Sequence, residues 1–516
     1  MAASTFDEIP RQKFPDRFNC VEVFADRQVA IGNADRTAII TAEATVTYGQ
    51  LAERVRRYGQ ALIDLGITPG DRVALLLPDC PEFIYLFMGA IHTGIIPVPL
   101  NTALGAGDYA YIIDDCECAG IIYAADFEKT IVEAVSKSIT HPKVCLPLQA
   151  LTERALTVQA RSDCHPARAE DDCYILYSSG TTGKPKGVVH AHSCLPVISG
   201  IFAEHMIGRS DGDVILSMPR LYTSFGMGIG MAIPLWLGAA VILDPHRPSP
   251  ELTVALFRQF KPTIFAAVPT FYSQLIACGQ LHREEASSLR FCLSGGEAMP
   301  AELLRRWTSL TGVPVREIIG STEAGFVYIG NRMDDIRPGT SGKPLPGFQL
   351  RIVDANGQPC ADGVPGRLLI RGQSLMTRYW NNPVKTASAL IDGWLDTGDI
   401  YFRNHDGYYS YCGRGDDMLK VGGRWISPFE IESTLIEHPK VLEVAVVGRA
   451  DDEGLTKAEA WVVLKDQRYA SESTSDELRA FCKERLAPYK RPKWIHFTEE
   501  LPKTASGKVQ RFKLRQ

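Results

Sequence analysis

The chain has 516 residues, 45% of them hydrophobic and 22% charged, so it can bury a large core and is too long for one ordinary domain. Lys and Arg total 55 against 60 Asp and Glu, and the net charge of −5 excludes the basic footprint of a nucleic-acid-binding or membrane-surface protein. The 13 cysteines are too few and too scattered for a disulfide scaffold and indicate free thiols in a reducing cytosol. We therefore expect a cytoplasmic protein of several domains.

Two segments bear on targeting and on membranes. The amino-terminal residues include Asp7 and Glu8 where a secretory signal needs an apolar run, so we expect no targeting segment there. Residues 225–243 carry no charge and have the length of a membrane span. Pro234, four glycines and the slightly negative mean hydropathy of the chain favour a buried helix followed by a core strand over a membrane helix.

The first two-thirds of the chain alternate short apolar runs with amphipathic stretches, which is typical of strands and crossover helices. Apolar residues recur at helical spacing after Thr47 and stop at Gly66, and an apolar strand follows at residues 72–78. A similar strand is expected at residues 262–269, with a helix after it. The nearly continuous apolar character of these strands indicates sheets covered on both faces.

The character of the sequence changes near residue 400, where it becomes aromatic, glycine-rich and charged. Beyond this point we expect a small α+β unit with strands at 441–448, 460–464 and 494–498 and a helix from about 476 to 486. About 100 residues is an ordinary size for a separate domain. The predicted domains are therefore residues 1–414 and 415–516.

A segment rich in glycine and hydroxyl side chains, Leu176-Tyr-Ser-Ser-Gly-Thr-Thr-Gly-Lys-Pro-Lys-Gly-Val-Val189, follows an apolar strand. Glycines let successive backbone N–H groups point at one anion, hydroxyls add donors, and lysine adds positive charge. The segment predicts a phosphate cradle, with a flexible surface loop as the alternative. It is not the P-loop of NTPases, because Ser178 stands where that loop has its first glycine and Pro185 follows Lys184.

The same segment resembles the signature of the adenylate-forming superfamily, which includes acyl-CoA synthetases, peptide-synthetase adenylation domains and luciferases. Other signatures of that family follow in order: Gly295-Gly-Glu297, Gly320-Ser-Thr-Glu323, Asp396-Thr-Gly-Asp399, Gly413-Arg-Gly-Asp-Asp417 and Pro502-Lys-Thr-Ala-Ser-Gly-Lys508. Further segments are most similar to the benzoate-CoA ligase branch: Asn101-Thr-Ala-Leu104, Asp108-Tyr-Ala-Tyr111, Asp417-Met-Leu-Lys420, Ser427-Pro-Phe-Glu-Ile-Glu432 and Gln510-Arg-Phe-Lys-Leu-Arg515. The resemblance spans most of the chain. It implies an α/β fold whose large N-terminal body has several subdomains with parallel-type sheets covered by helices, plus a small mobile α+β C-terminal domain.

The resemblance also implies a reaction: a carboxylate attacks the α-phosphate of ATP and gives an acyl adenylate and pyrophosphate. It assigns Thr322 to the α-phosphate, Glu323 to Mg²⁺, and Lys508 to a bridge between the carboxylate and the α-phosphate. Asp399, with two acceptor oxygens, would bind the ribose hydroxyls, assisted by Arg414. The implied nucleotide site comprises Ser179, Gly180, Thr181, Thr182, Gly183, Lys186, Gly295, Gly296, Glu297, Ile318, Ile319, Asp399 and Arg414. Mg²⁺ prefers carboxylate oxygens, so the nearby His190, His192 and Cys194 are interpreted as structural.

A second half-reaction, transfer of the acyl group to coenzyme A, is implied by the same resemblance. Gly422 and Gly423 would line the pantetheine path, and Asp416 would be the hinge about which the small domain rotates between the two steps. We predict that Lys508→Ala abolishes adenylate formation while thioester formation from pre-made adenylate survives. Loss of both steps to the same extent would contradict this division of labour.

The segment Arg220-Leu-Tyr-Thr-Ser-Phe-Gly-Met-Gly228 and residues 320–327 resemble the walls of the acid pocket. The implied substrate contacts are Tyr222, Thr223, Ser224, Phe225, Gly320, Gly325 and Phe326. Benzoate enzymes tend to carry Phe-Phe-Ala-Tyr-Gly at 222–226 and His at 326, so this chain adds two hydroxyls beside the ring. A pocket that hydrogen-bonds a ring substituent disfavours analogues without it. We therefore expect 2-aminobenzoate first, then benzoate or a hydroxybenzoate; alternatively the hydroxyls bond only backbone and the pocket is permissive.

Taken together, these features predict an ATP-dependent aryl-CoA ligase that uses ATP, Mg²⁺ and coenzyme A. One alternative is an adenylating enzyme that loads a carrier protein, and another is a non-catalytic nucleotide or acyl binder. The expected partners are small molecules, with no nucleic acid and no membrane, and the protein is expected to be a monomer or a homodimer.

Overall fold

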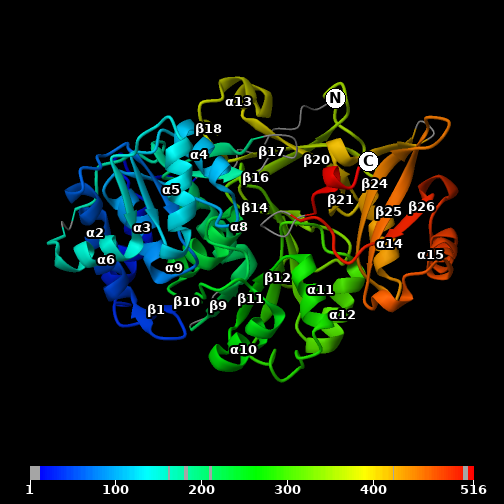
Figure 1. The fold of residues 1–516 in the computed structure, drawn as a ribbon, viewed down its shortest axis with the longest axis horizontal. Helices are drawn as coiled ribbons and strands as arrows, with labels where there is room; N and C mark the ends of the chain where they lie inside the picture. Colours follow the sequence, from blue (N-terminus) through cyan, green and yellow to red (C-terminus); the bar gives the residue numbers. More distant parts are fainter. Residues whose placement is uncertain are drawn as a thin grey trace.

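A nine-stranded sheet runs through the large body of the molecule in the order β15-β14-β13-β12-β11-β9-β10-β1-β2 (Figure 1). The computed structural model describes residues 12–160, 163–178, 184–208, 212–421, 424–503 and 509–515. The run from β1 to β13 is parallel, whereas β2, β14 and β15 pair antiparallel at the two edges. The strands are β1 Thr37–Ile40, β2 Thr45–Thr47, β9 Val214–Ser217, β10 Ala240–Ile242, β11 Ile264–Ala267, β12 Phe291–Ser294, β13 Val315–Gly320, β14 Val327–Gly330 and β15 Lys343–Pro344.

Helices lie against this sheet. Those on the outer side, at the bottom of Figure 1, are α10 Pro250–Phe260, α11 Pro269–Ala277 and α12 Ala301–Thr311. The uncharged segment 225–243 forms α8 Ser224–Met227, a buried π-helical stretch Gly228–Ala232, α9 Ile233–Leu237 and then strand β10. Within the described residues, no helix has both the length and the apolar character that a membrane crossing requires. The prediction of a buried helix followed by a core strand is confirmed.

The second parallel sheet has the order β4-β3-β5-β6 and is covered on both faces. Its strands are β3 Arg72–Leu76, β4 Ile96–Pro99, β5 Gly120–Tyr123 and β6 Val144–Pro147. Alternate residues of β3 enter different cores: Val73 and Leu75 join the largest cluster, and Ala74 and Leu76 join the cluster beneath α4 and α5. The helices of this region are α2 Tyr48–Asp64, α3 Pro81–His92, α4 Ala106–Asp115, α5 Glu128–Lys137 and α6 Leu148–Thr157. The expectation of sheets with two covered faces is confirmed.

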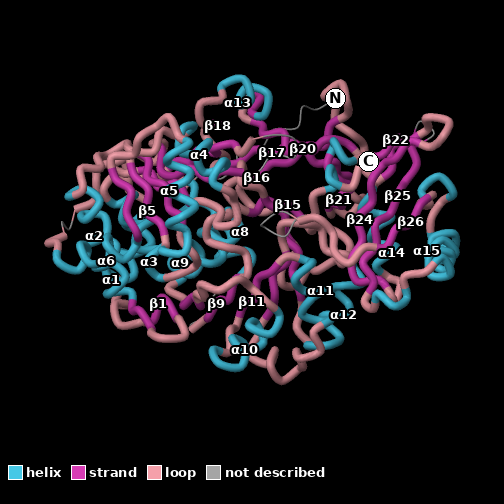
Figure 2. The backbone as a smooth tube through the Cα atoms, viewed as in Figure 1, coloured by secondary structure: helices cyan, strands magenta, loops and turns pink. Residues whose placement is uncertain are grey.

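Two smaller antiparallel sheets complete the body, and the second of them leads into the carboxyl-terminal unit (Figure 2). The first contains β7 Asp172–Ser178, β8 Lys186–Ala191 and β18 Arg378–Tyr379. The second contains β16 Phe348–Val353, β17 Gly366–Gly372, β19 Leu390–Ile391, β20 Trp394–Arg403 and β21 Tyr409–Arg414. The remaining helices of the body are α1 Arg27–Ala30, α7 Cys194–Phe202 and α13 Pro383–Ala389.

The carboxyl-terminal unit, at the right of Figures 1 and 2, has its own sheet and its own core. Its elements are β22 Leu419–Val421, β23 Arg424–Ile426, α14 Pro428–Ile436, β24 Val441–Ala450, β25 Thr456–Leu464, α15 Glu472–Arg485 and β26 Trp494–Phe497. A separate hydrophobic cluster runs from Leu419 to Ile495. Each strand and the helix expected from the sequence are present, with boundaries within four residues of the prediction. The division at residues 414 and 415 stays a prediction.

Candidate active site

Three of the predicted site segments lie at the carboxyl ends of parallel strands of the nine-stranded sheet. Tyr222–Phe225 follow β9, Gly295–Glu297 follow β12, and Gly320–Phe326 lie at the end of β13. These three strands are parallel, and ligands of open α/β sheets bind outside the carboxyl ends of such strands. The fold therefore brings together segments that are about 100 residues apart in sequence.

Glu323 is held in a defined position at this edge. Its Oε1 accepts a hydrogen bond of 2.9 Å from the hydroxyl of Tyr379, and its backbone oxygen accepts one of 2.7 Å from the N–H of Met376. The carboxylate is half-buried. A hard divalent cation prefers oxygen ligands of this kind, so the Glu323 carboxylate fits the predicted role of holding Mg²⁺. Tyr379 was not predicted, since its partner is 56 positions away and no local pattern joins them.

Two lysines meet beside the same tyrosine. The Nζ of Lys186, at the start of β8, lies 5.6 Å from the centroid of the Tyr379 ring. Desolvation, together with a direct contact to the ammonium group of Lys385, lowers the pKa of Lys186 to about 8. Lys385 reaches this place from the first turn of α13, which is tied to β18 by the 3.0 Å bond from Tyr379 N–H to the Thr386 hydroxyl. Two ammonium groups in contact repel, and a bound polyphosphate relieves that repulsion.

Asp399 and Arg414 face each other across the β20–β21 pair. Nη1 of the Arg414 guanidinium donates a hydrogen bond of 3.0 Å to Asp399 Oδ1 and one of 2.9 Å to the Thr397 carbonyl. The two residues are direct partners in the antiparallel register. Arg414 thus fixes one carboxylate oxygen of Asp399, which agrees with the assisting role expected for it.

The adenine side of the predicted site is close to the acid side. A Cβ built on Gly295 would lie 3.0 Å from Ile318 Cγ1 and 3.1 Å from Phe225 Cε1, so a larger residue would require these two side chains to move by a few tenths of an ångström. Ile318 and Ile319 are buried. From the carboxyl-terminal unit, Val509 donates its backbone N–H to Glu297 Oε1 at 3.3 Å. The residue that follows Lys508 in sequence therefore contacts the Gly295–Glu297 segment, which is predicted to form one wall of the adenine site.

Aromatic rings surround the position that the sequence predicts for the acid pocket. Phe326 is buried and lies 6.2 Å from Phe225 between ring centroids, with Phe202 behind it at 5.0 Å. Tyr222 is buried, and its hydroxyl bonds to the side chain of Thr102. The wall is therefore mainly apolar.

The two hydroxyls that the sequence placed beside the ring have different partners. The Thr223 hydroxyl donates a hydrogen bond of 2.7 Å to the Arg220 carbonyl and accepts one of 3.0 Å from the Gly226 N–H. The second bond caps the amino terminus of α8. The single proton of this hydroxyl is used by the first bond, and the prediction that Thr223 contacts a ring substituent stays a prediction. Ser224 Oγ lies 3.4 Å from Thr322 Oγ1, a long contact, so its hydroxyl is still available to a ligand.

Part of the predicted site lies outside the described residues: Ser179, Gly180, Thr181, Thr182, Gly183, Gly422, Gly423 and Lys508. Asp416 is exposed in a short turn between β21 and β22, and its carbonyl accepts a 3.3 Å bond from Arg515. Its role as a hinge stays a prediction.

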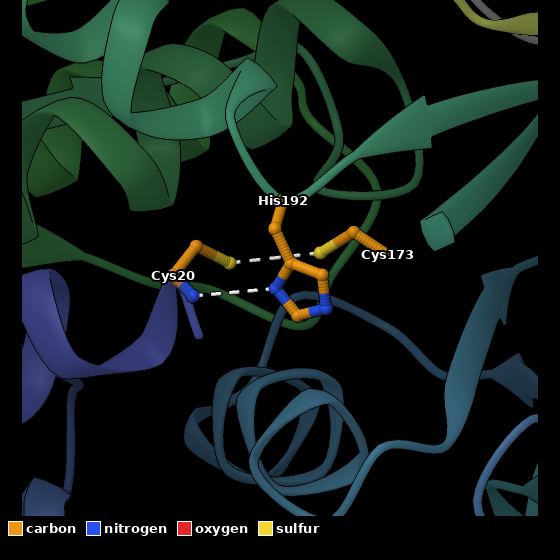
Figure 3. A group of neighbouring side chains, drawn as sticks. All are labelled: Cys20, Cys173 and His192. Atoms are coloured by element: carbon orange, nitrogen blue, oxygen red, sulfur yellow. Dashed lines mark hydrogen bonds between the residues drawn. The ribbon is translucent and has the colours of Figure 1, made fainter. Parts of the chain in front are cut away.

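Outside this edge, Cys20, Cys173 and His192 form a buried cluster whose candidate ligand atoms lie within 4.8 Å of one another (Figure 3). The two sulfur atoms are 3.5 Å apart, and Nδ1 of His192 accepts a 3.3 Å hydrogen bond from the Cys20 backbone N–H. The lone pair of His192 Nδ1 is therefore already used by the Cys20 backbone N–H, and the two thiols are hydrogen-bonded to each other. His190 lies in the same region, stacked on Tyr174, and burial lowers its pKa to about 4. The cluster can thus be explained as core packing.

Known proteins match along nearly the whole chain. The family model described as AMP-binding enzyme matches residues 26–380, and that described as AMP-binding enzyme C-terminal domain matches residues 430–508. The benzoate-CoA ligase of Thauera aromatica is 40% identical over 98% of this chain and 97% of its own length. The solved anthranilate CoA ligase AuaEII in complex with anthranoyl-AMP has a TM-score of 0.93 at 36% identity and 97% coverage of both chains. A benzoate CoA ligase from Burkholderia xenovorans LB400 has a TM-score of 0.91 at 35% identity, covering 97% of this chain and all of that one.

Proposed function

Because the chain belongs to the AMP-binding enzyme family and is an AMP-forming aryl-CoA ligase, we propose that its acid is benzoate and its acceptor free coenzyme A. Enzymes of this kind use ATP, Mg²⁺ and coenzyme A. The reaction would convert benzoate, ATP and CoA into benzoyl-CoA, AMP and pyrophosphate.

The observation that carries the choice of benzoate is the character of the acid pocket. The Phe225 and Phe326 rings give it an apolar wall suited to an unsubstituted ring, and the only proton of the Thr223 hydroxyl is donated to a backbone carbonyl. A ring substituent would therefore find fewer polar partners than the sequence suggested. The likeness to two benzoate-CoA ligases supports the same acid.

In the first half-reaction a benzoate oxygen would attack the α-phosphorus of ATP and pyrophosphate would leave. The attacking and attacked groups are both anionic, so positive charge must be gathered around them. Lys186 and the loop before it would hold the β- and γ-phosphates, Glu323 would hold Mg²⁺, and Asp399 would hold the ribose. Thr322 and Lys508 would contact the α-phosphate, where negative charge concentrates.

In the second half-reaction the sulfur of CoA would attack the carbonyl carbon of benzoyl-AMP and AMP would leave, the thiol proton passing to solvent. The contact between Val509 and Glu297 supports an arrangement in which Lys508 serves the first step. For the second step the carboxyl-terminal unit would rotate about Asp416 and bring Gly422 and Gly423 to the path of the CoA pantetheine. The Lys508→Ala variant tests this: it should lose adenylate formation and keep thioester formation from benzoyl-AMP.

The second candidate acid is 2-aminobenzoate, which two observations favour. Ser224 has a hydroxyl available at the pocket wall, and a 36% identical solved structure is an anthranilate CoA ligase. Ser224→Ala distinguishes the candidates: the change should leave kcat/KM for benzoate nearly unaltered. If Ser224 recognises an amino group, kcat/KM with 2-aminobenzoate as the acid should fall by about tenfold, the equivalent of one hydrogen bond.

Pyrophosphate release with a panel of benzoate, 2-aminobenzoate and hydroxybenzoates, with and without CoA, tests the proposed function directly. Acid-dependent release followed by a benzoyl-CoA product supports it. Adenylate formed without thioester product would favour a carrier protein as the acceptor. Absence of acid-dependent release with every acid would refute catalysis and favour a nucleotide or acyl binder.

A further inference from the structure

A buried acidic residue outside the family signatures contacts the start of the segment that is predicted to form the acid pocket. Asp79 follows strand β3 of the four-stranded sheet, and its side chain is 6% exposed. Its Oδ1 accepts a 3.1 Å hydrogen bond from the backbone N–H of Leu221, and its Oδ2 lies 3.4 Å from Nη1 of Arg220. Asp79 therefore contacts two consecutive residues at the start of the segment that forms the pocket wall.

Arg220 is held on its other side as well. Its guanidinium donates one hydrogen bond of 2.9 Å to the carbonyl of Asp244 and a second hydrogen bond to the carbonyl of His246. These carbonyls follow β10, so Arg220 joins loops from both parallel sheets. A planar guanidinium with several fixed donors is suited to such a role, and lysine could not replace it.

The backbone of Arg220 closes the turn that carries the pocket residues. Its carbonyl oxygen accepts hydrogen bonds from the Thr223 N–H at 2.9 Å and from the Thr223 hydroxyl at 2.7 Å. A Cβ built on Gly226 would lie 2.0 Å from the same oxygen, so only glycine fits there. The positions of Ser224 and Phe225 therefore depend on where the Arg220 carbonyl is held.

We propose that Asp79 is a positioning residue for the aryl acid: by fixing Arg220 and Leu221 it sets the affinity for the acid without touching it. This inference rests on the proposed function. Burial raises the pKa of Asp79 to about 6, partly offset by Arg220, so the pair is ionic at neutral pH. A charge pair with little exposure keeps its geometry better than a surface pair, because separating it would leave both charges buried and unpaired.

The test compares Asp79→Asn with a matched control in pyrophosphate-release assays, varying benzoate and ATP separately. Asparagine keeps an acceptor for the Leu221 N–H and removes the charge opposite Arg220. The KM for benzoate should rise by about tenfold, which corresponds to about 1.4 kcal/mol of binding free energy lost when the pocket wall moves, while the KM for ATP stays within about twofold. A rise confined to benzoate is a result that general loss of stability cannot give.

The control is Asp213→Asn, which lies at the amino-terminal end of strand β9, whereas the segment predicted to form the acid pocket follows its carboxyl end. Asp213 precedes β9, is buried, and pairs with Arg290 at 2.6 Å, far from the carboxyl end of that strand. It should lower the melting temperature comparably and leave both KM values within about twofold. If Asp79→Asn does not fold, the double variant Asp79→Asn with Arg220→Gln removes both charges together and should show the same selective rise.

Three results would overturn the inference: an unchanged KM for benzoate in the Asp79 variants, an equal rise in the KM for ATP, or an equal rise in the control. Failure of the proposed function gives a different result, because the unaltered enzyme would then release no pyrophosphate with any aryl acid.

Discussion

A buried carboxyl group beneath the adenine side of the site should make the stability of this protein fall between mildly acidic and mildly basic pH. Glu317 lies on β13, directly before Ile318, and is 3% exposed. Burial raises its pKa from the ordinary 4.5 to about 8, although hydrogen bonds from the Met299 backbone and from the Ser341 hydroxyl, the latter 3.4 Å long, partly oppose this. The folded protein therefore keeps a proton that the unfolded chain has lost.

The sign and the size follow from proton linkage. Below pH 4.5 the group is protonated in both states and the contribution to stability is complete; it is lost as the pH rises through the folded pKa of about 8. Each pH unit in this interval removes about 1.4 kcal/mol of unfolding free energy. Between about pH 5.5 and about pH 8.5 the loss should be about 3 kcal/mol.

The perturbation that exposes this effect is Glu317→Gln, which keeps the shape and remains neutral at every pH. Urea unfolding followed by tryptophan fluorescence, at about pH 5.5 and about pH 8.5, should show the variant gaining about 3 kcal/mol on the wild type between the two conditions. The free-energy cost of burying the Gln amide does not depend on pH, so it cancels when the stability of the variant is compared between the two pH values. The reasoning is refuted if the gain is below about 1 kcal/mol or has the opposite sign.

Glu302→Gln on α12 is the control. Burial opposes ionisation of Glu302, but hydrogen bonds from Arg305 and Arg306 outweigh it and lower its pKa. Glu302 is thus ionised in both states throughout the interval, and its substitution should change stability by the same amount at both pH values. A pH-dependent change in this control would show that the assay reports other groups.

Three further results are expected at the site. Lys385→Met should raise the pKa of Lys186 from about 8, because it removes a neighbouring positive charge. The loss of ATP affinity at basic pH should then move to higher pH, which a measurement of the KM for ATP against pH would show. Tyr379→Phe, which removes the 2.9 Å donor to Glu323, should lower kcat/KM for MgATP by up to about tenfold in a Mg²⁺ titration. Asp399→Asn should raise the KM for ATP by at least about tenfold and leave the KM for the acid unaltered, and equal changes in both would contradict a ribose-binding role.

Much of the fold could be predicted because its signals are local. Thr47 is the N-cap of helix α2, where its side chain accepts a hydrogen bond from the Gln50 N–H, and the chain turns at Gly66 with φ +84°, as the sequence indicated. The alternating strands and helix of the carboxyl-terminal unit were predicted for the same reason. Capping, periodicity and turn residues act over a few positions, so a single sequence contains them in full.

The chemistry of the site could be predicted only as far as its residue types. The predicted phosphate-binding segment, Glu323 and Asp399 are recognisable in the sequence because their charges and glycines form short patterns. Tyr379 was missed because its partner Glu323 is 56 positions away, and Asp79 because Leu221 is 142 positions away. No local pattern connects residues at such separations.

The sequence by itself determined the order of the elements, the kind of chemistry and the set of charged groups that carries it. The tertiary structure alone decided which partner each group has. Thr223 shows the difference: the sequence predicts its hydroxyl beside the acid, and the folded turn decides that its proton goes to the Arg220 carbonyl and that its oxygen accepts from the Gly226 N–H. A hydroxyl binds whichever partners the fold brings within about 3 Å, and that choice depends on the packing of parallel strands whose ends meet only after folding.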